Sequence, residues 1–253
     1  MRWDPVQYAR YSSQRSRPFF DLTAQLDVKN PGTVVDLGCG SGELTVTLAE
    51  RWPGASIRGI DSSTEMIEKT PVARNVTFTV GTAQDFDATG TDVLISNAML
   101  QWVPDHEELL VSWGRQLNRR GRLAFQVPAN FDAPSHRLMR ELAESPPWRH
   151  RLHEVLRGAD AVADPATYLD LLMRQGLQVD VWQTEYLHVL QGPDPVLDWV
   201  RATGLRPILA VLSDQDAAAF SAEYAAALRQ AYPQQPYGTV FGFTRTFVLA
   251  RKP

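Results

Sequence analysis

The sequence predicts an α/β fold with an open, mostly parallel sheet covered by helices on both faces. Three observations support this class. Short runs rich in β-branched residues alternate with amphipathic helical segments through the first half of the chain. A glycine-rich turn follows the first of these runs. The chain also has 253 residues, of which 44% are hydrophobic, so it is long enough and apolar enough to bury the core of one domain.

The first half of the chain contains five candidate strands. A polar, arginine-rich stretch at residues 1–18 precedes them and leads into an amphipathic segment that ends at Leu26. The candidate strands are residues 33–37, 57–61, 76–80, 92–96 and 122–127. Each is a short run bounded by turn or helix-start residues, as expected for strands of a buried sheet.

Three helices are expected between these strands. The first places Leu44, Leu48 and Trp52 on one face and ends at the Pro53-Gly54 turn. For the second, Ser62 and Glu65 have the spacing of a capping box. For the third, Asp105 and Glu108 are the expected cap of a helix with an apolar face.

The second half of the chain has a different pattern. Residues 128–176 and 193–232 are mainly helical, whereas 178–190 and 239–250 are strand-like. We therefore expect one α/β domain with two helical insertions that cover the carboxyl edge of the sheet, where ligands of such sheets bind.

Composition excludes several function classes. The formal net charge of −4 argues against general nucleic-acid binding, which favours a basic surface. No apolar run approaches the roughly 20 residues that a membrane span requires, and the first ten residues lack a signal-peptide core. The single cysteine, Cys39, cannot form a disulfide within the chain and is typical of a reducing cytoplasm.

The strongest functional motif is the turn from Asp36 to Gly42, which reads Asp-Leu-Gly-Cys-Gly-Ser-Gly. Its glycines allow the backbone to turn tightly and to approach a ligand without interference from a Cβ atom. Asp61 ends the next strand, where a carboxylate can accept hydrogen bonds from a ribose diol. A nicotinamide-binding fingerprint would have its third glycine at Glu43, and no lysine of the phosphate-binding loop type follows the turn.

This turn, followed by an acidic end of the second strand, resembles the Rossmann-like S-adenosylmethionine-dependent methyltransferases. Further blocks are similar to the trans-aconitate 2-methyltransferase family and extend over almost the whole chain. These blocks are Trp3-Asp4-Pro5-x-x-Tyr8, Arg15-Ser16-Arg17-Pro18, Gly59-Ile60-Asp61-Ser62-Ser63, Asn97-Ala98-x-Leu100-Gln101-Trp102-x-Pro104-Asp105-His106 and Asp198-Trp199-Val200-x-Ala202-Thr203-Gly204-Leu205-Arg206-Pro207. The resemblance implies the seven-stranded methyltransferase fold, a soluble cytoplasmic enzyme, and transfer of a methyl group from S-adenosyl-L-methionine to a carboxylate of trans-aconitate. The products would be a monomethyl ester and S-adenosyl-L-homocysteine.

The resemblance also implies a set of cofactor-binding residues. Gly38, Gly40 and Gly42 would line the methionine part with Asp36 beneath them, and Asp61 would hold the ribose hydroxyls. The remaining candidates are Ser62, Thr82, Ala83 and Gln84 around the adenine, and Asn97 and Leu100 near the sulfonium. Many family members have an acidic residue at about Thr82, so this chain departs from the family pattern there.

A trianionic acceptor requires cations at defined positions. The candidate substrate-binding residues are Arg15, Arg17 and Arg206, together with His188 and with Trp102 as an apolar wall. No catalytic acid or base and no metal are expected, because a methyl sulfonium is already activated and a carboxylate with a pKa near 4 is already ionised at neutral pH.

The expected organisation is a single methyltransferase domain over residues 1–253. Its expected parts are an N-terminal cover at 1–30, a cofactor-binding core at 31–127, helical lid insertions at 128–176 and 191–235, and final strands at 177–190 and 237–251. Two functional alternatives stay open. The chain could methylate another small carboxylic acid or metabolite, or it could bind the cofactor without catalysis. The only expected partner is a small tricarboxylate, and the sequence does not indicate the oligomeric state.

Overall fold

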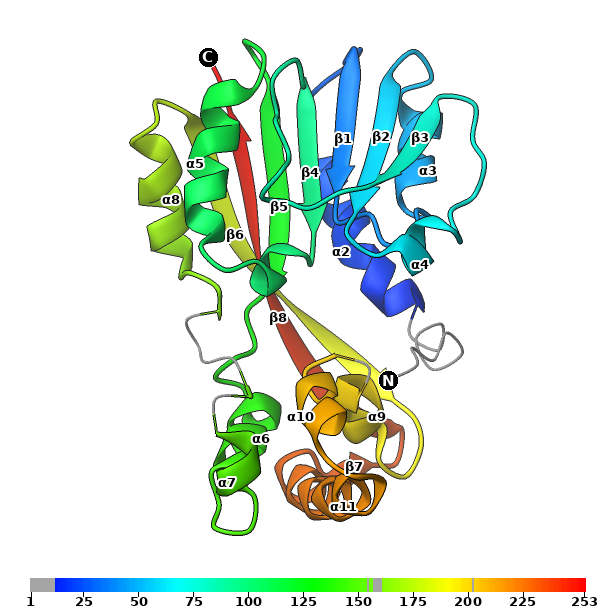
Figure 1. Ribbon diagram of the computed structural model, residues 1–253, viewed down its shortest axis with the longest axis vertical. Coiled ribbons are helices and arrows are strands. Elements are labelled where there is room, and N and C mark those ends of the chain that lie inside the picture. The colour runs from blue at the N-terminus through cyan, green and yellow to red at the C-terminus, as the bar shows by residue number, and fades with distance from the viewer. Residues whose placement is uncertain (1–11, 154, 157–160, 202) are drawn as a thin grey trace. The chain divides into compact units, whose positions relative to one another are not determined.

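The computed structural model describes residues 12–153, 155–156, 161–201 and 203–253 (Figure 1). The chain forms two compact units. The sheet unit comprises residues 16–128, 161–184 and 245–253, and the helical unit comprises residues 1–15, 129–160 and 185–244. The expected division into cover, core and lids stays a prediction, and its first eleven residues lie outside the described part of the chain.

One sheet contains the main strands in the order β3-β2-β1-β4-β5-β8-β6. The bounds are β1 Thr33–Leu37, β2 Ser56–Asp61, β3 Val76–Val80, β4 Val93–Asn97, β5 Arg122–Pro128, β6 Gln178–Leu190 and β8 Gly238–Arg251. Strands β1 to β5 pair in parallel, whereas β8 runs antiparallel to β5. The expected open, mostly parallel sheet is therefore confirmed.

The central strands form because most positions along them are apolar and nearly all are buried. All five residues of β4 except the last are buried, and so are the first six residues of β5. Strands covered on both faces have this continuous pattern rather than an alternating one. The chain order reverses between β1 and β4, and in open sheets ligands bind at such a switch point, beyond the carboxyl ends of the strands.

Among the described residues, six helical elements belong wholly or mostly to the sheet unit. They are α2 Ser12–Ala24, α3 Thr45–Arg51, α4 Thr64–Ile67, the short 3-10 helix η1 Leu100–Trp102, α5 His106–Gln116 and α8 Pro165–Met173. Helices α5 and α8 lie beside each other (Figure 1) and are joined by a 2.7 Å hydrogen bond between His106 Nε2 and Tyr168 Oη. None of the helices in the described ranges is long and apolar enough to span a bilayer.

Two expected helix caps are wrong in detail. Helix α4 is capped by Ser63, whose hydroxyl accepts a hydrogen bond from the amide of Met66, so the cap lies one residue later than the expected Ser62. Asp105 does precede α5, but its backbone has a φ of 54° and its side chain forms no capping hydrogen bond. A left-handed backbone differs from the extended conformation that directs a capping side chain toward the free amides.

The helical unit has a hydrophobic core of its own. Its elements are α6 Pro134–Ala143, α7 Arg149–Leu152, α9 Pro195–Arg201, α10 Arg206–Val211, α11 Asp214–Ala231 and the two-residue strand β7 Gln234–Gln235, which pairs with β8. This core combines aliphatic residues with large aromatic ones, among them Trp199, Phe220 and Tyr224. Tyr224 also donates a 2.6 Å hydrogen bond to the carbonyl of Ser135, which joins α11 to α6.

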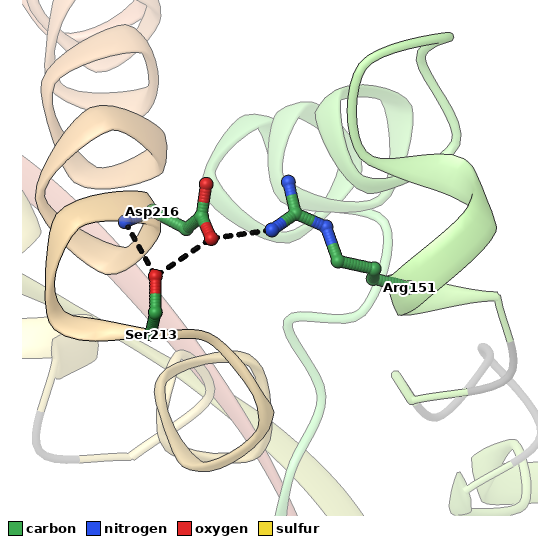
Figure 2. A network of polar contacts seen from close by, with 3 residues as sticks. All are labelled: Arg151, Ser213 and Asp216. Carbon is green, nitrogen blue, oxygen red and sulfur yellow. Dashed lines mark hydrogen bonds and ion pairs between the residues drawn. The ribbon is translucent and has the colours of Figure 1, made fainter.

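A polar network joins α7 to the start of α11. Ser213 caps α11 by accepting a hydrogen bond from the amide of Asp216, and its hydroxyl donates to the Asp216 carboxylate (Figure 2). Arg151 donates to the same carboxylate. The hydrogen bond from Ser213, followed by that from Arg151, lowers the pKa of Asp216 below its usual value, so the carboxylate stays ionised and holds the two helices together.

Candidate functional site

The glycine-rich turn between β1 and α3 is held against the end of β2. The amides of Gly38 and Cys39 both donate to the carbonyl oxygen of Ile60, at 2.7 and 3.1 Å. The three glycines have φ values of +81°, +56° and +75° for Gly38, Gly40 and Gly42. Side-chain-bearing residues rarely adopt this left-handed conformation, so the path of the turn depends on glycine at all three positions.

The three glycines differ in what surrounds them. A Cβ atom at Gly38 would lie 2.4 Å from Cγ of Met99, and one at Gly42 would lie 2.5 Å from the ring of Phe78. At Gly40, by contrast, no atom lies within 4 Å of the corresponding position. The turn is therefore packed against protein at its two ends and open at its centre, where a ligand can approach the backbone.

Asp61 connects the second strand to this turn. One carboxylate oxygen accepts a 2.9 Å hydrogen bond from the amide of Gly40, and the other accepts one of 2.9 Å from the amide of Ser63. Each carboxylate oxygen can accept a second hydrogen bond. The half-buried side chain is thus oriented by backbone donors and retains acceptor capacity for the hydroxyl groups of a ligand.

Asp36 lies at the end of β1, buried under the turn. Its carboxylate accepts a 2.6 Å hydrogen bond from the hydroxyl of Thr45, the first residue of α3. Burial raises its pKa to about 6, the bond from Thr45 opposes this shift, and the charge of Asp61 adds to it. Asp36 therefore supports the turn from within the core, since its carboxylate is directed to Thr45.

Cys39 lies in the turn, within electrostatic reach of both Asp36 and Asp61. Burial, followed by the charges of Asp36 and Asp61, raises the pKa of its thiol. A thiol that stays protonated is a poor nucleophile. Cys39 thus fills space in the turn rather than reacting.

The segment after β3 contains an acid that our sequence interpretation did not include. Thr82 and Gln84 are exposed, as is Ser62, whereas Ala83 is buried. The Thr82 hydroxyl donates a 2.6 Å hydrogen bond to the Asp85 carboxylate and accepts one from the Asp85 amide. An exposed carboxylate is therefore present next to Thr82, three residues after the position where the family pattern has its acid. The Asp at 85 in the sequence was the available signal.

Asn97 at the end of β4 belongs to a polar chain that crosses three strands. Its Oδ1 accepts a 2.7 Å hydrogen bond from Nε2 of Gln126 on β5, and Oε1 of Gln126 accepts a 3.0 Å bond from Arg245 on β8. Neither Gln126 nor Arg245 was among the predicted site residues. The available signal was an amide or charged residue inside a mostly apolar strand. Leu100, the other candidate in this region, is fully buried.

Two candidate acceptor-binding residues lie in the sheet unit. Arg17 on α2 is 69% exposed and forms an ion pair of 3.5 Å with Asp21, one helical turn further on. Trp102 ends η1 and is 45% exposed. Arg15 is also part of α2, but its side chain lies outside the described residues.

The other two candidates lie in the helical unit. Arg206 begins α10 and is exposed, and its guanidinium makes no hydrogen bond or ion pair with any residue that the structure describes. His188 on β6 is stacked against the ring of Trp199, with 4.8 Å between ring centroids, and against that of Tyr186. Arg206 is thus presented to solvent, whereas His188 is held by aromatic neighbours.

Within the described ranges, no group of three or more histidine, cysteine, aspartate or glutamate side chains could hold a metal ion.

Comparisons with known proteins match this chain to methyltransferases. The family described as Methyltransferase domain matches residues 11–180. A Streptomyces avermitilis protein named trans-aconitate 2-methyltransferase is 51% identical over 99% of this chain and 97% of its own length. A Rhodococcus jostii protein of the same name is 46% identical over 98% of this chain and 99% of its own length.

Solved structures share the fold at low sequence identity. A putative methyltransferase from Bacillus halodurans superposes with a TM-score of 0.59 at 15% identity, covering 93% of this chain and 98% of that one. A putative sarcosine dimethylglycine methyltransferase from Galdieria sulphuraria has a TM-score of 0.56 at 16% identity, covering 99% of this chain and 91% of that one. The sheet and its helices therefore form an α/β methyltransferase fold.

Proposed function

Because the chain belongs to the family of trans-aconitate 2-methyltransferases, we propose that it transfers a methyl group from S-adenosyl-L-methionine to a carboxylate of trans-aconitate. The products are a monomethyl ester and S-adenosyl-L-homocysteine. The observation that carries this proposal is the 51% identity to a relative of that name over nearly the full length of both chains.

The sheet unit has the features that this cofactor requires. The open backbone at Gly40 allows close approach to the methionine part, and the Asp61 carboxylate has acceptor capacity for two ribose hydroxyls. Ser62 and the segment from Thr82 to Gln84 are proposed to frame the adenine, with Asp85 available for its amino group. When bound, the cofactor supplies a methyl group on a positively charged sulfur, which keeps the electron pair of the broken bond.

The chain's own residues have a limited task in this reaction. The acceptor carboxylate is ionised at neutral pH, so no side chain needs to remove a proton. Alignment of the attacking oxygen with the methyl carbon and sulfur is the main requirement, and such alignment contributes up to roughly 7–11 kcal/mol in favourable cases. We therefore assign the site residues to binding and orientation, and none to acid–base catalysis.

The acceptor is proposed to be held by cationic side chains. Arg17 and Arg206 are the principal candidates, with Arg15 and His188 as further ones and Trp102 as an apolar wall. The exposed guanidinium of Arg206 supports its assignment, because it is available for two-point binding of a carboxylate. One carboxylate of the acid must stay free of an arginine, because an oxygen held in an ion pair is a weaker nucleophile.

The proposal is tested with methyl-labelled cofactor and a panel of small di- and tricarboxylic acids. We expect base-labile label in an organic product with trans-aconitate and little with the other acids. Preferred turnover of a different acid would identify another acceptor. Cofactor binding without turnover of any acid would mean that the chain is a non-catalytic binding protein.

Substitution of the proposed arginines tests the acceptor side. Arg17→Ala and Arg206→Ala are expected to raise KM for the acid by about tenfold or more, with little effect on the KM for the cofactor. Arg174 is a matched control for Arg17, because it forms the same kind of exposed ion pair one helical turn from Asp170. Arg229 is the control for Arg206 in the helical unit, where it pairs with Asp194. Unchanged kinetics of both test variants would remove these arginines from the site.

We further infer that the enzyme acts in the cytoplasm on a free small molecule. The single cysteine, which cannot form a disulfide within the chain, supports this location. Cell fractionation with an antibody to the chain tests it, and recovery of the protein in the medium would contradict it.

A further inference from the structure

Three polar side chains from different strands meet at the carboxyl edge of the sheet unit. Asn97 ends β4, Gln126 lies near the end of β5, and Arg245 is the β8 residue opposite Pro128 at the end of β5. Gln126 is 0% exposed and Arg245 is 6% exposed, whereas Asn97 is half-buried. A buried amide and a buried guanidinium are costly to desolvate, so their hydrogen bonds define their orientation strictly.

The direction of the hydrogen bonds among these three side chains follows from the chemistry of arginine. A guanidinium can only donate, so the Gln126 atom that contacts Arg245 must be the oxygen. The Gln126 amide nitrogen is then the atom directed to Asn97, where it donates to Oδ1. Asn97 is left with its Nδ2 hydrogens, which are donated to no residue that the structure describes.

The backbone around Asn97 restricts its movement as well. Ala98, the next residue, has a φ of 54° and donates its amide to the carbonyl oxygen of Gln126 at 3.0 Å. Met99 packs against Gly38 of the glycine-rich turn. The Asn97 side chain is thus hydrogen-bonded to β5, and Met99, two residues further along the chain, contacts the glycine-rich turn.

We propose that Arg245, acting through Gln126, orients the Asn97 amide so that its Nδ2 hydrogens bind an oxygen of the acceptor carboxylate. This inference rests on the proposed function and adds an acceptor-binding group to it. Asn97 contacts the substrate, whereas Gln126 and Arg245 are positioning residues. The expectation that Asn97 contacts the cofactor is the competing assignment.

A neutral donor suits the carboxylate that is to be methylated. A guanidinium at that position would form a two-point ion pair with both oxygens and reduce their nucleophilicity. One N–H donor can hold the oxygen that does not react and leave the other free to attack. The arrangement therefore separates the positive charge of Arg245 from the reacting group by two amides, those of Gln126 and Asn97, while using that charge to determine the orientation of the Asn97 amide.

Gln126→Glu reverses the direction of the hydrogen bond between residue 126 and Asn97 without changing the size of the side chain. Both oxygens of the introduced carboxylate accept, so it still binds Arg245 but now requires a donor from Asn97, which turns Oδ1 toward the acceptor. We expect the KM for trans-aconitate to rise about tenfold to a hundredfold, the effect of losing a hydrogen bond to a charged group, with the cofactor Kd unchanged.

Gln183→Glu is the matched control. Gln183 lies on β6, is exposed, and donates a 3.0 Å hydrogen bond to the hydroxyl of Thr246 on β8. A hydroxyl both donates and accepts, so it tolerates the same reversal. We expect the control to keep wild-type KM values for acid and cofactor.

A second variant keeps the inference testable if Gln126→Glu does not fold. Asn97→Asp alters a half-buried residue and replaces the donor with a negative charge that repels the acid. We expect the KM for trans-aconitate to rise at least tenfold, while the Kd of the positively charged cofactor stays equal or falls. A weaker cofactor Kd with an unchanged acid KM would overturn the inference and favour the cofactor assignment.

A binding measurement separates failure of this inference from failure of the proposed function. In the presence of S-adenosyl-L-homocysteine, addition of trans-aconitate is expected to shift the side-chain amide resonances of Asn97 in the 15N-labelled wild type but not in Gln126→Glu. If the wild type methylates trans-aconitate but both variants bind the acid normally, the inference fails and the function stands. If the wild type neither binds nor methylates trans-aconitate, the proposed function fails, and this inference fails with it.

Discussion

Replacement of Gly38 by alanine tests how the glycine-rich turn is packed. The new Cβ would lie 2.4 Å from Cγ and 2.5 Å from Cβ of Met99, at a residue whose φ is +81°. The left-handed backbone costs about 1–2 kcal/mol for a residue with a Cβ atom, and forced overpacking adds typically about 1–3 kcal/mol. We therefore expect Gly38→Ala to lower the free energy of unfolding by about 2–5 kcal/mol.

Two other glycines separate the two contributions. Gly40→Ala meets no atom within 4 Å but has a φ of +56°, so we expect only the backbone cost of about 1–2 kcal/mol. Gly54 also has open space and no left-handed φ, so Gly54→Ala should change stability by less than about 0.5 kcal/mol. Urea unfolding of the three variants without ligand measures all three values. Equal losses for Gly38→Ala and Gly40→Ala would refute the role of Met99.

Cofactor affinity is expected to separate the same variants differently. We propose that the cofactor approaches the open space at Gly40. The Kd for the cofactor should therefore rise in Gly40→Ala, although this variant stays folded. Gly54→Ala should bind the cofactor normally. Calorimetry with S-adenosyl-L-homocysteine provides this measurement, and wild-type affinity in Gly40→Ala would place the cofactor elsewhere.

Three further predictions concern acids and caps. Asp36→Asn should stabilise the protein at pH 7.5 by up to about 3 kcal/mol but should not stabilise it at pH 4. The pKa of the Asp36 carboxyl is 3.8 in the unfolded chain and about 6 in the folded protein, so the wild type loses stability as the pH rises through this range. Urea unfolding at both pH values checks this, and an equal offset at both would contradict it. Asp61→Ala should raise the Kd for S-adenosyl-L-homocysteine about tenfold or more, because the charged acceptors are lost. Asp170→Ala, at an exposed position of α8, should leave this Kd unchanged. Equal Kd values for the two variants would count against the ribose assignment. Ser213→Ala should lower the free energy of unfolding by about 1 kcal/mol through loss of the α11 cap, and no change in the denaturation midpoint would show that the cap is dispensable.

The strands could be predicted from the sequence because each leaves a short-range pattern, a continuous apolar run in a buried strand such as β4 and an alternating one in the partly exposed β6. Residues 33–37, 76–80 and 178–190 were predicted with their observed bounds, and β2, β4, β5 and β8 within one residue at each end. The two-residue strand β7 was not predicted. The acid at Asp61 was also placed correctly at the end of the second strand. In these cases the signal is local, so a short window contains it.

The details that depend on three-dimensional packing could not be predicted. Two adjacent serines, Ser62 and Ser63, both satisfy the composition of a cap, and only the backbone path selects the second. The contact between Gly38 and Met99 joins residues about 60 positions apart. The hydrogen bonds from Arg245 to Gln126 and from Gln126 to Asn97 could be predicted only if the strand order were known, because Arg245 is adjacent to Gln126 only when β8 lies beside β5.

The place of β8 in the sheet also affects how the protein is made. This last strand, Gly238–Arg251, lies between β5 and β6, both of which precede it in the chain. During synthesis on a ribosome, β1 to β5 can assemble early, but β6 has no neighbour until the residues up to 251 have emerged. We therefore expect the nascent chain to expose unpaired edges of β5 and β6 late in translation, when chaperone binding would limit aggregation.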